Sequence, residues 1–373
     1  MRLTIKREEL VKALNIASRA VGGKVAVSAL SNLKFELDEK GLFITGSNYD
    51  LTIKTFTPYK IGENDIIRNY KEGCTLLNTK IICDIARKMS GDELTLDVID
   101  STIATISDTI SEYQLNCVKP EEYPDLDLEP TGTKIVVARD EFSKIVSQTA
   151  FAASTKEQRP ALTALNLEAE NGVLTATATD SARMARKQIS IPDGISFSAN
   201  VPAKMMVEID HLTEGANEIE ISFSDKKALF IINDIVISTR LIAAEYPNTK
   251  NIVPKITNHL LEVPSSDLLK AIDRANILSI ERENVVELTM TADGVEISAK
   301  SSQIGSAVDK LQTFRYEGED LKISFNSEFV NAAIRALNSS DVTFLFVGEM
   351  KPFIIKNASD DSVVQIVTPV RTY

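Results

Sequence analysis

Cysteine and histidine are scarce in this chain, which has three cysteines and two histidines in 373 residues. Cys74, Cys83 and Cys117 show no CxxC spacing, and neither His211 nor His259 has another histidine or a cysteine nearby. An odd number of thiols without metal-ligand spacing is typical of reduced, structural cysteines in a cytosolic protein. With so few histidines and cysteines, a zinc site or a Ser-His-Asp triad is not expected. We therefore expect no metal and no cofactor.

Long hydrophobic runs and nucleotide-binding motifs are also missing. No stretch approaches the roughly 20 apolar residues that span a bilayer, and the initial MRLTIKREEL lacks the apolar core of a signal peptide. We expect a cytoplasmic protein with no membrane partner. The patterns GxxxxGK[ST], GxGxxG, HExxH and GxSxG do not occur, which favours binding over catalysis.

The remaining composition is that of an ordinary globular protein. Hydrophobic residues make up 43% and charged residues 25% of the chain, with a net charge of −12. This excludes general disorder, because there is enough apolar material to form cores. At roughly 150 residues per domain, the length predicts two or three domains.

An internal repeat of about 125 residues organises the chain. LTIKREELVKAL at residue 3 aligns with IVVARDEFSKIV at 135 and with LEVPSSDLLKAI at 261. Each segment alternates like a strand and then continues as an amphipathic helix. Lys12, Lys144 and Lys270 occupy the same repeat position.

The alignment continues downstream in the same order. Strand–turn–strand patterns follow, with Asn171-Gly172 and Asp293-Gly294 as hairpin signals. A second helix is predicted in NTKIICDIARKM, PAKMMVEIDHL and NSEFVNAAIRAL, and alternating strands come after it. The pattern predicts an α+β fold with three domains of one kind, at 1–129, 130–254 and 255–373, each with two helices and about eight strands.

The triplication and several motifs resemble the bacterial sliding clamp family, the β subunit of DNA polymerase III. The most specific motifs are Thr179-Asp180-Ser181-Ala182-Arg183-Met184, Glu245-Tyr246-Pro247 and Pro369-Val370-Arg371. The resemblance covers the whole chain. It implies a head-to-tail homodimer, a six-domain ring that encircles double-stranded DNA, and no catalytic residue. Implied partners are the DNA polymerase III catalytic subunit, the clamp loader, other DNA polymerases and mismatch-repair proteins.

The resemblance also implies DNA-contacting residues. By match to the family these are Lys24, Lys156, Arg159, Lys204, Arg282 and Asn326. The net charge of −12 opposes strong DNA binding, although residues 7–24 carry four basic and two acidic side chains. We expect weak, sequence-independent phosphate contacts that allow sliding.

The resemblance also implies a peptide-binding pocket between the second and third domains. Its family-matched residues are Leu162, Thr179, Ser181, Ala182, Arg183, Met184, Pro247, Ile252, Met350, Pro352, Ile366, Thr368 and Pro369. Apolar walls with few polar groups suit a short hydrophobic anchor peptide. Ala182 and Thr368 replace a larger polar and a larger apolar residue common in the family, so peptide preference is expected to differ.

The family match places the dimer contact between domain one of one chain and domain three of the other. Its residues are Lys80, Arg87, Ile277 and Leu278, with the strand around 104–111 near the facing surface. Pairing of edge strands from two chains would remove exposed edges.

Two alternatives stay open at this point. One is a hydrolase of the same fold that uses carboxylates such as Asp180 and Glu245, although Asp180 beside Arg183 is better explained by a local ion pair. The other is a non-replicative protein-recruitment scaffold with no DNA in its hole.

Overall fold

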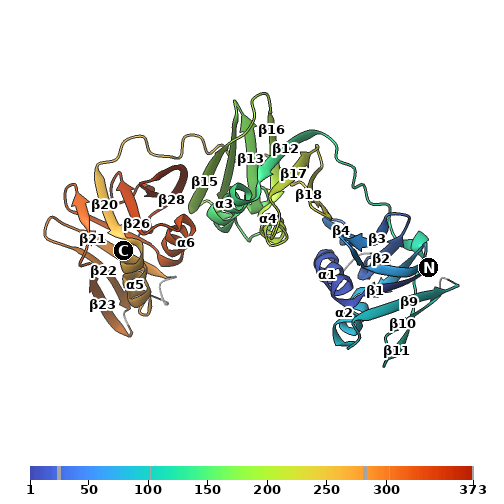
Figure 1. Cartoon of the computed structure of the whole chain (residues 1–373). Helices are drawn as coiled ribbons and strands as arrows, with labels where there is room; N and C mark the ends of the chain where they lie inside the picture. The colour runs from blue at the N-terminus through green and yellow to red at the C-terminus, as the bar shows by residue number, and fades with distance from the viewer. Residues whose placement is uncertain (23–26, 101, 280–283, 302, 372–373) are drawn as a thin grey trace. The chain divides into compact units, whose positions relative to one another are not determined.

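The computed structural model describes residues 1–22, 27–100, 102–279, 284–301 and 303–371. Two compact units form, one from residues 1–139 and 211–241, the other from residues 140–210 and 242–373. The second repeat is therefore divided between the units. Figure 1 labels the elements along the chain.

The first repeat begins with an alternating strand that leads directly into a helix, as the sequence predicts. Leu3 and Ile5 of β1 point into the core, and Leu10 and Leu14 continue that apolar stripe on α1. Its elements are β1 (Arg2–Lys6), α1 (Arg7–Ala17), β2 (Asn32–Leu37), β3 (Gly41–Ser47), β4 (Leu51–Pro58), β5 (Lys60–Ile61), β6 (Asn64–Asp65), β7 (Ile67–Lys71), β8 (Gly73–Asn78), α2 (Thr79–Lys88), β9 (Glu93–Ile99), β10 (Ile103–Ser107) and β11 (Glu112–Asn116).

The second repeat follows the same order. Its elements are β12 (Thr133–Ala138), α3 (Arg139–Thr149), β13 (Ala164–Glu170), β14 (Val173–Thr179), β15 (Arg183–Ser190), β16 (Phe197–Pro202), α4 (Ala203–Asp210), β17 (Glu218–Phe223), β18 (Lys227–Ile232) and β19 (Ile235–Arg240). The predicted Asn171-Gly172 hairpin is confirmed. Both residues have left-handed φ angles, of 52° and 75°, and they connect the paired Glu170 and Val173, which is the geometry of a two-residue type I′ turn.

The third repeat contains β20 (His259–Pro264), α5 (Ser265–Asn276), β21 (Val285–Met290), β22 (Val295–Ser301), β23 (Gly305–Lys310), β24 (Arg315–Glu317), β25 (Leu321–Asn326), α6 (Ser327–Leu337), β26 (Asp341–Phe346), β27 (Phe353–Asn357) and β28 (Asp360–Val367). The prediction of two helices per repeat is thus confirmed in the described part of the chain. The Asp293-Gly294 hairpin is also present, as a loop between the paired Met290 and Val295.

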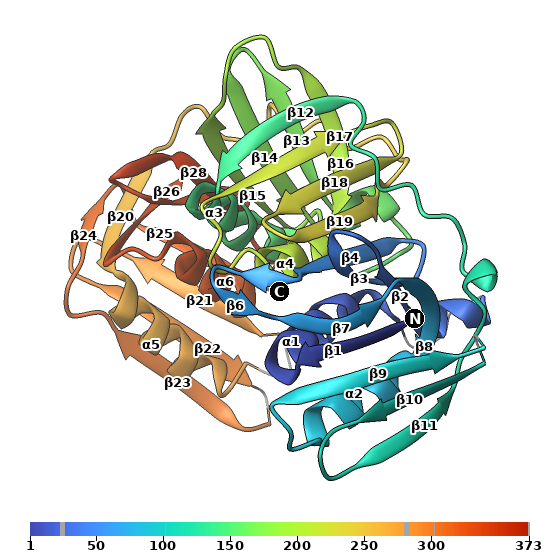
Figure 2. The same cartoon turned by 45° about the vertical axis from the view of Figure 1, so that its right-hand side comes forward.

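Antiparallel sheets connect consecutive repeats within each unit. In the first unit, one sheet has the order β12-β17-β18-β19-β4-β3-β2-β8, and a second has the order β11-β10-β9-β1-β7 (Figure 2). In the second unit, the sheets run β16-β13-β14-β15-β28-β27-β26-β20-β24 and β23-β22-β21-β25. The junctions between repeats are therefore single strand pairs, β4 with β19 and β15 with β28.

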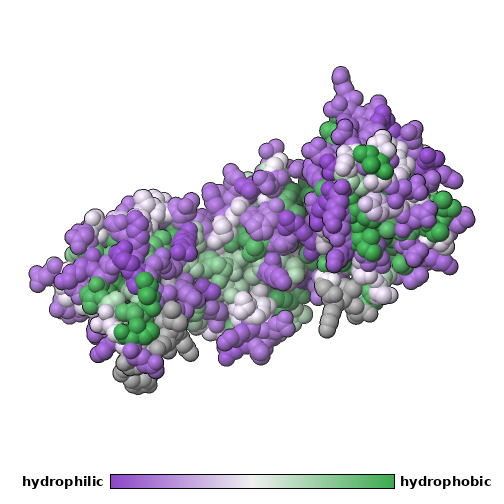
Figure 3. Space-filling model, turned by 90° about the horizontal axis from the view of Figure 1, so that it is seen from below, coloured by the Kyte–Doolittle hydropathy of each residue, from purple (hydrophilic) through white to green (hydrophobic). Residues whose placement is uncertain are grey.

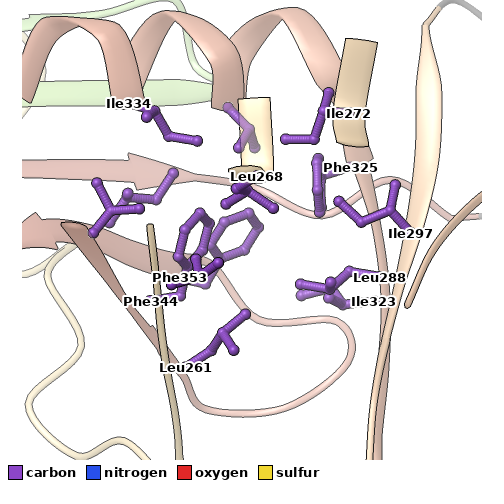
Figure 4. Close-up of a cluster of buried hydrophobic side chains, with 14 of the residues drawn as sticks. Leu261, Leu268, Ile272, Leu288, Ile297, Ile323, Phe325, Ile334, Phe344 and Phe353 are labelled. Carbon is purple, nitrogen blue, oxygen red and sulfur yellow. The ribbon is translucent and has the colours of Figure 1, made fainter. Parts of the chain in front are cut away.

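In the first and third repeats, the helix pair packs over sheet faces and encloses an apolar core. Figure 4 shows the core of the third repeat, where Leu268 and Ile272 of α5 and Ile334 of α6 gather with Phe325, Phe344 and Phe353 of the strands. Among the described residues, no helix is long and apolar enough to cross a membrane.

Candidate peptide pocket and interface residues

A tight turn between β14 and β15 forms the centre of the predicted pocket. One carboxylate oxygen of Asp180 accepts the backbone N–H groups of Ala182 at 2.9 Å and Arg183 at 3.0 Å. The Thr179 hydroxyl donates to the Arg183 carbonyl at 2.6 Å and accepts the Ser181 N–H at 3.1 Å. Ser181 has a φ of 82°, a left-handed conformation that these bonds compensate. The Asp180 carboxylate therefore serves the turn.

The side chain of Arg183 crosses from the second repeat to the third. Its Nε donates to the second carboxylate oxygen of Asp180 at 3.0 Å. Its guanidinium carbon lies 4.5 Å from the ring centroid of Phe329 on α6 and 5.5 Å from that of Phe151, which follows α3. Cation–π attraction strengthens where the cation is shielded from water, and this side chain is only 18% exposed. Sequence reasoning found Arg183 but missed both phenylalanines.

A small apolar cluster lies behind the turn. Met184 of β15 pairs directly with Ile366 of β28, and both are 2% exposed. Ile354 completes the buried cluster, and Val253, Leu345 and Val364 pack against it. The Thr368 N–H donates to the Ala182 carbonyl at 2.9 Å, so the two strands remain connected up to the turn.

The structure brings some of the predicted pocket residues together and places others apart. Thr179, Ser181, Ala182, Arg183, Met184, Ile366 and Thr368 belong to the turn and the adjoining strand pair. Leu162 is buried in a short 3-10 helix, Pro160–Thr163. Pro247 lines a polar cavity of about 320 Å³, and Met350 lines another of about 470 Å³ beside Val370 and Arg371. Ile252 is exposed, and Pro352 and Pro369 are partly exposed. Their assignment to one pocket stays a prediction.

The predicted DNA-contacting residues differ in how accessible they are. Lys156, Arg159 and Lys204 are exposed, and Arg159 donates to the Ser181 hydroxyl at 3.3 Å. Asn326 caps α6, because its side-chain oxygen accepts the N–H groups of Glu328 and Phe329. Lys24 and Arg282 lie outside the described residues.

The predicted dimer residues differ in exposure. Lys80, Arg87 and Ile277 are exposed, and Ile277, directly after α5, is 66% exposed. Arg87 donates to the Asn15 side chain at 2.7 Å, and Leu278 is partly buried against the third repeat's own core. A bidentate ion pair between Arg274 of α5 and Asp309 of β23 holds the end of this helix beside β23. The hydrogen bond from Arg274 lowers the pKa of Asp309.

Comparison with known proteins accounts for all three repeats. Sequence profiles of the DNA polymerase III beta subunit match its N-terminal domain at residues 1–127, its central domain at 136–248 and its C-terminal domain at 250–371. The chain belongs to this family. Its three repeats are clamp domains, and its function is that of a DNA sliding clamp.

Individual relatives cover the full length of the chain. The beta sliding clamp of Halalkalibacterium halodurans is 33% identical, and that of Bacillus subtilis is 31% identical, with 100% of each chain covered. The crystal structure of the DNA polymerase sliding clamp from Bacillus subtilis superposes with a TM-score of 0.97 at 30% identity, again over 100% of both chains. The predicted α+β fold of three clamp domains is confirmed.

Proposed function

We propose that two copies of this clamp chain close head to tail into a ring around double-stranded DNA. The ring would tether the DNA polymerase III catalytic subunit to its template as a non-catalytic accessory subunit in the cytoplasm. A topological link of this kind needs no strong DNA affinity, which fits a net charge of −12.

Two free sheet edges carry this proposal. At each internal junction, the third strand after the first helix of one repeat pairs with the last strand of the next repeat: β4 pairs with β19, and β15 pairs with β28. The corresponding strands without such a partner are β23 of the third repeat and β11 of the first. Each of them is at the edge of its sheet. The family match indicates the strand around 104–111 near this surface, and β10 (Ile103–Ser107) lies between β9 and β11. The edge strand is β11.

Repeat equivalence also predicts the register of the missing strand pair. Leu51 pairs with Thr239, and Arg183 pairs with Val367. Gly305 is the equivalent of Leu51 and Arg183, and Leu115 is the equivalent of Thr239 and Val367. At the proposed contact between β23 and β11 of the partner copy, the same register therefore sets Gly305 opposite Leu115 and Ser306 opposite Gln114. Antiparallel pairing there would satisfy backbone groups that now face solvent.

Exposed apolar side chains support the same contact. Phe151 packs against the core of the third repeat, and Ile277 occupies the equivalent position at the end of α5. Phe329, which lies with Phe151 against Arg183 at the internal junction, corresponds to Ile81 of α2. Ile81 is 48% exposed and Ile277 is 66% exposed. Figure 3 shows one face of the molecule, which is mostly hydrophilic with a few hydrophobic patches. Ile81 and Ile277 occupy the positions that Phe329 and Phe151 fill at the internal junction, and this match supports a contact between chains.

We further propose that the pocket around Met184 and Arg183 receives a short peptide with hydrophobic anchors. The clamp loader, other DNA polymerases and mismatch-repair proteins would use the same site. Two buried anchor side chains would each contribute about 1.5–3 kcal/mol before ordering costs. A dissociation constant in the micromolar range, about −8 kcal/mol, is the expected result.

Contacts with DNA would come from exposed basic residues such as Lys156 and Lys204. Each contact would be weak and independent of base sequence. A scaffold that recruits proteins but holds no DNA is the alternative. The hydrolase alternative loses support, because the turn uses the Asp180 carboxylate in three hydrogen bonds.

A covalently closed ring tests the proposal. The Gln114→Cys/Ser306→Cys variant, oxidised after loading onto nicked circular DNA by a loader ATPase, should stay on the circle at high salt and leave after linearisation. The Gln114→Cys single variant is the matched control and should not cross-link between chains. Equal loss from circular and linear DNA would refute encirclement, and failure of the double variant to cross-link would refute the register.

A further inference from the structure

A buried lysine lies in the strand pair that joins the second and third repeats. Lys187 of β15 is 4% exposed. It occupies a core-facing position between Ala185 and Ile189, which are both buried, and it pairs with Ala176 on its other side. A charged side chain in such a place is costly unless it is paired and hydrogen-bonded.

Both partners of Lys187 belong to the third repeat. Its Nζ lies 3.1 Å from a carboxylate oxygen of Asp360 and 2.6 Å from the hydroxyl of Ser362. Ser362 in turn donates its backbone N–H to the other Asp360 oxygen at 2.9 Å. The ammonium group therefore bonds a set of acceptors that is assembled at the start of β28.

The hairpin that precedes β28 does not by itself fix how β28 pairs with β15. Turn geometry sets the register between the two strands of its own hairpin, and β15 is not part of the β27–β28 hairpin. β28 pairs with β15 without interruption from Val363 to Val367, so contacts between these two strands have to select their register.

The junction between the first and second repeats lacks this arrangement. The residue equivalent to Lys187 is Thr55, whose hydroxyl donates to the Ile44 carbonyl within its own repeat at 3.3 Å. The pocket-forming pair Met184–Ile366 is replaced there by Thr52 and Ser238, which pair with each other. The buried lysine and the apolar pocket thus occur at the same junction, on opposite faces of one strand pair.

We propose that Lys187 selects the register of β15 against β28 and thereby positions the two halves of the peptide pocket. A shift of β28 by one residue would turn Ile366 away from the face that carries Met184, and a shift of two would separate the two side chains along the strands. In either shifted register, Nζ would lose Asp360 and Ser362 while remaining buried. Lys187 is a positioning residue that does not contact the peptide. Its link to peptide binding rests on the proposed function.

The test uses Lys187→Met in the full chain, because methionine fills a similar volume without charge. Lys187→Met removes only one member of the pair, but the Asp360 side chain is 35% exposed and its carboxylate keeps contact with water, so the variant should remain folded. Cysteine pairs then report the register: Arg186→Cys/Val364→Cys detects the native register, and Gln188→Cys/Val364→Cys detects a two-residue shift. Lys356→Met is the matched control, since Lys356 pairs with Asp361 at 3.4 Å on the same sheet but is 30% exposed.

We expect the native cross-link to fall at least threefold in Lys187→Met and the shifted cross-link to appear, with peptide affinity reduced tenfold or more. Lys356→Met should behave like the parent chain. Ser362→Ala removes one acceptor without burying a new charge and should show a smaller change in the same direction. Native cross-linking unchanged in both Lys187→Met and Ser362→Ala would overturn the proposal. The cross-links need no peptide, so a parent chain that fails to bind peptide would refute only the pocket.

Discussion

Ile277 offers a quantitative test of the ring. Full burial of an isoleucine side chain contributes about 1.5–3 kcal/mol, and 66% of Ile277 is exposed in the single chain. Because alanine keeps part of that surface, Ile277→Ala should cost about 1–1.5 kcal/mol at each interface. A closed dimer has two identical interfaces, so the dissociation constant should rise roughly 30- to 150-fold at 1.4 kcal/mol per factor of ten.

Sedimentation velocity over a dilution series measures this constant. Ile256→Ala is the matched control, because Ile256 is 76% exposed but precedes β20, away from the β23 edge in sequence. Leu278 is unsuitable, since it packs against its own core and its loss would also affect folding. Equal dissociation constants for the Ile277→Ala and Ile256→Ala variants would show that Ile277 is not at the interface.

Three further predictions concern the pocket and the β23 edge. Arg183→Lys keeps the charge but loses the planar stacking on Phe329, so the free energy of unfolding in urea should fall by about 1–2 kcal/mol, whereas the exposed Arg315→Lys should change it little. Truncation before Pro369 should leave the dimer intact and abolish binding of a fluorescent anchor peptide, and undiminished affinity would place the pocket elsewhere. The lowered pKa of Asp309 means that its ion pair stabilises the fold above about pH 4 and that this stabilisation is lost as pH falls through the folded pKa. Asp309→Asn should therefore flatten the decline in urea stability below about pH 4.

Local patterns predicted most of the secondary structure because the repeats kept their alternation. The segment NTKIICDIARKM gives α2 at Thr79–Lys88, and the caps explain the boundary: the Asn78 side chain accepts the Ile81 N–H. The count of strands was less secure, since short edge strands such as β5 and β6 carry little apolar signal.

The site was less predictable from the residues themselves. The pairing of Met184 with Ile366 joins segments far apart in the chain, and the family resemblance supplied both residues without supplying the contact. Phe329 belongs to the apolar stripe of α6, and Phe151 lies in the short 3-10 helix after α3. No local pattern therefore separates an Arg183 partner from a core residue. Lys187 did leave a signal, because it interrupts the alternation of Ala185 and Ile189 on a core-facing strand position.

The junction between the first and second repeats has a consequence for how partners share a clamp. Its backbone turn matches that of the pocket: the Asn48 side chain accepts the N–H groups of Asp50 and Leu51, and Tyr49 has a φ of 73°. However, Thr52 and Ser238 occupy the positions of Met184 and Ile366 in the predicted pocket. This strand pair therefore presents no hydrophobic side chains there for an anchor peptide to bind. A closed dimer would then have two peptide-docking sites, one in each chain at the junction of the second and third repeats. The other junctions would have none. Enzymes that act one after another on the same stretch of DNA would have to displace each other from these sites. Their order of action would then depend on their concentrations and on their affinities for the clamp.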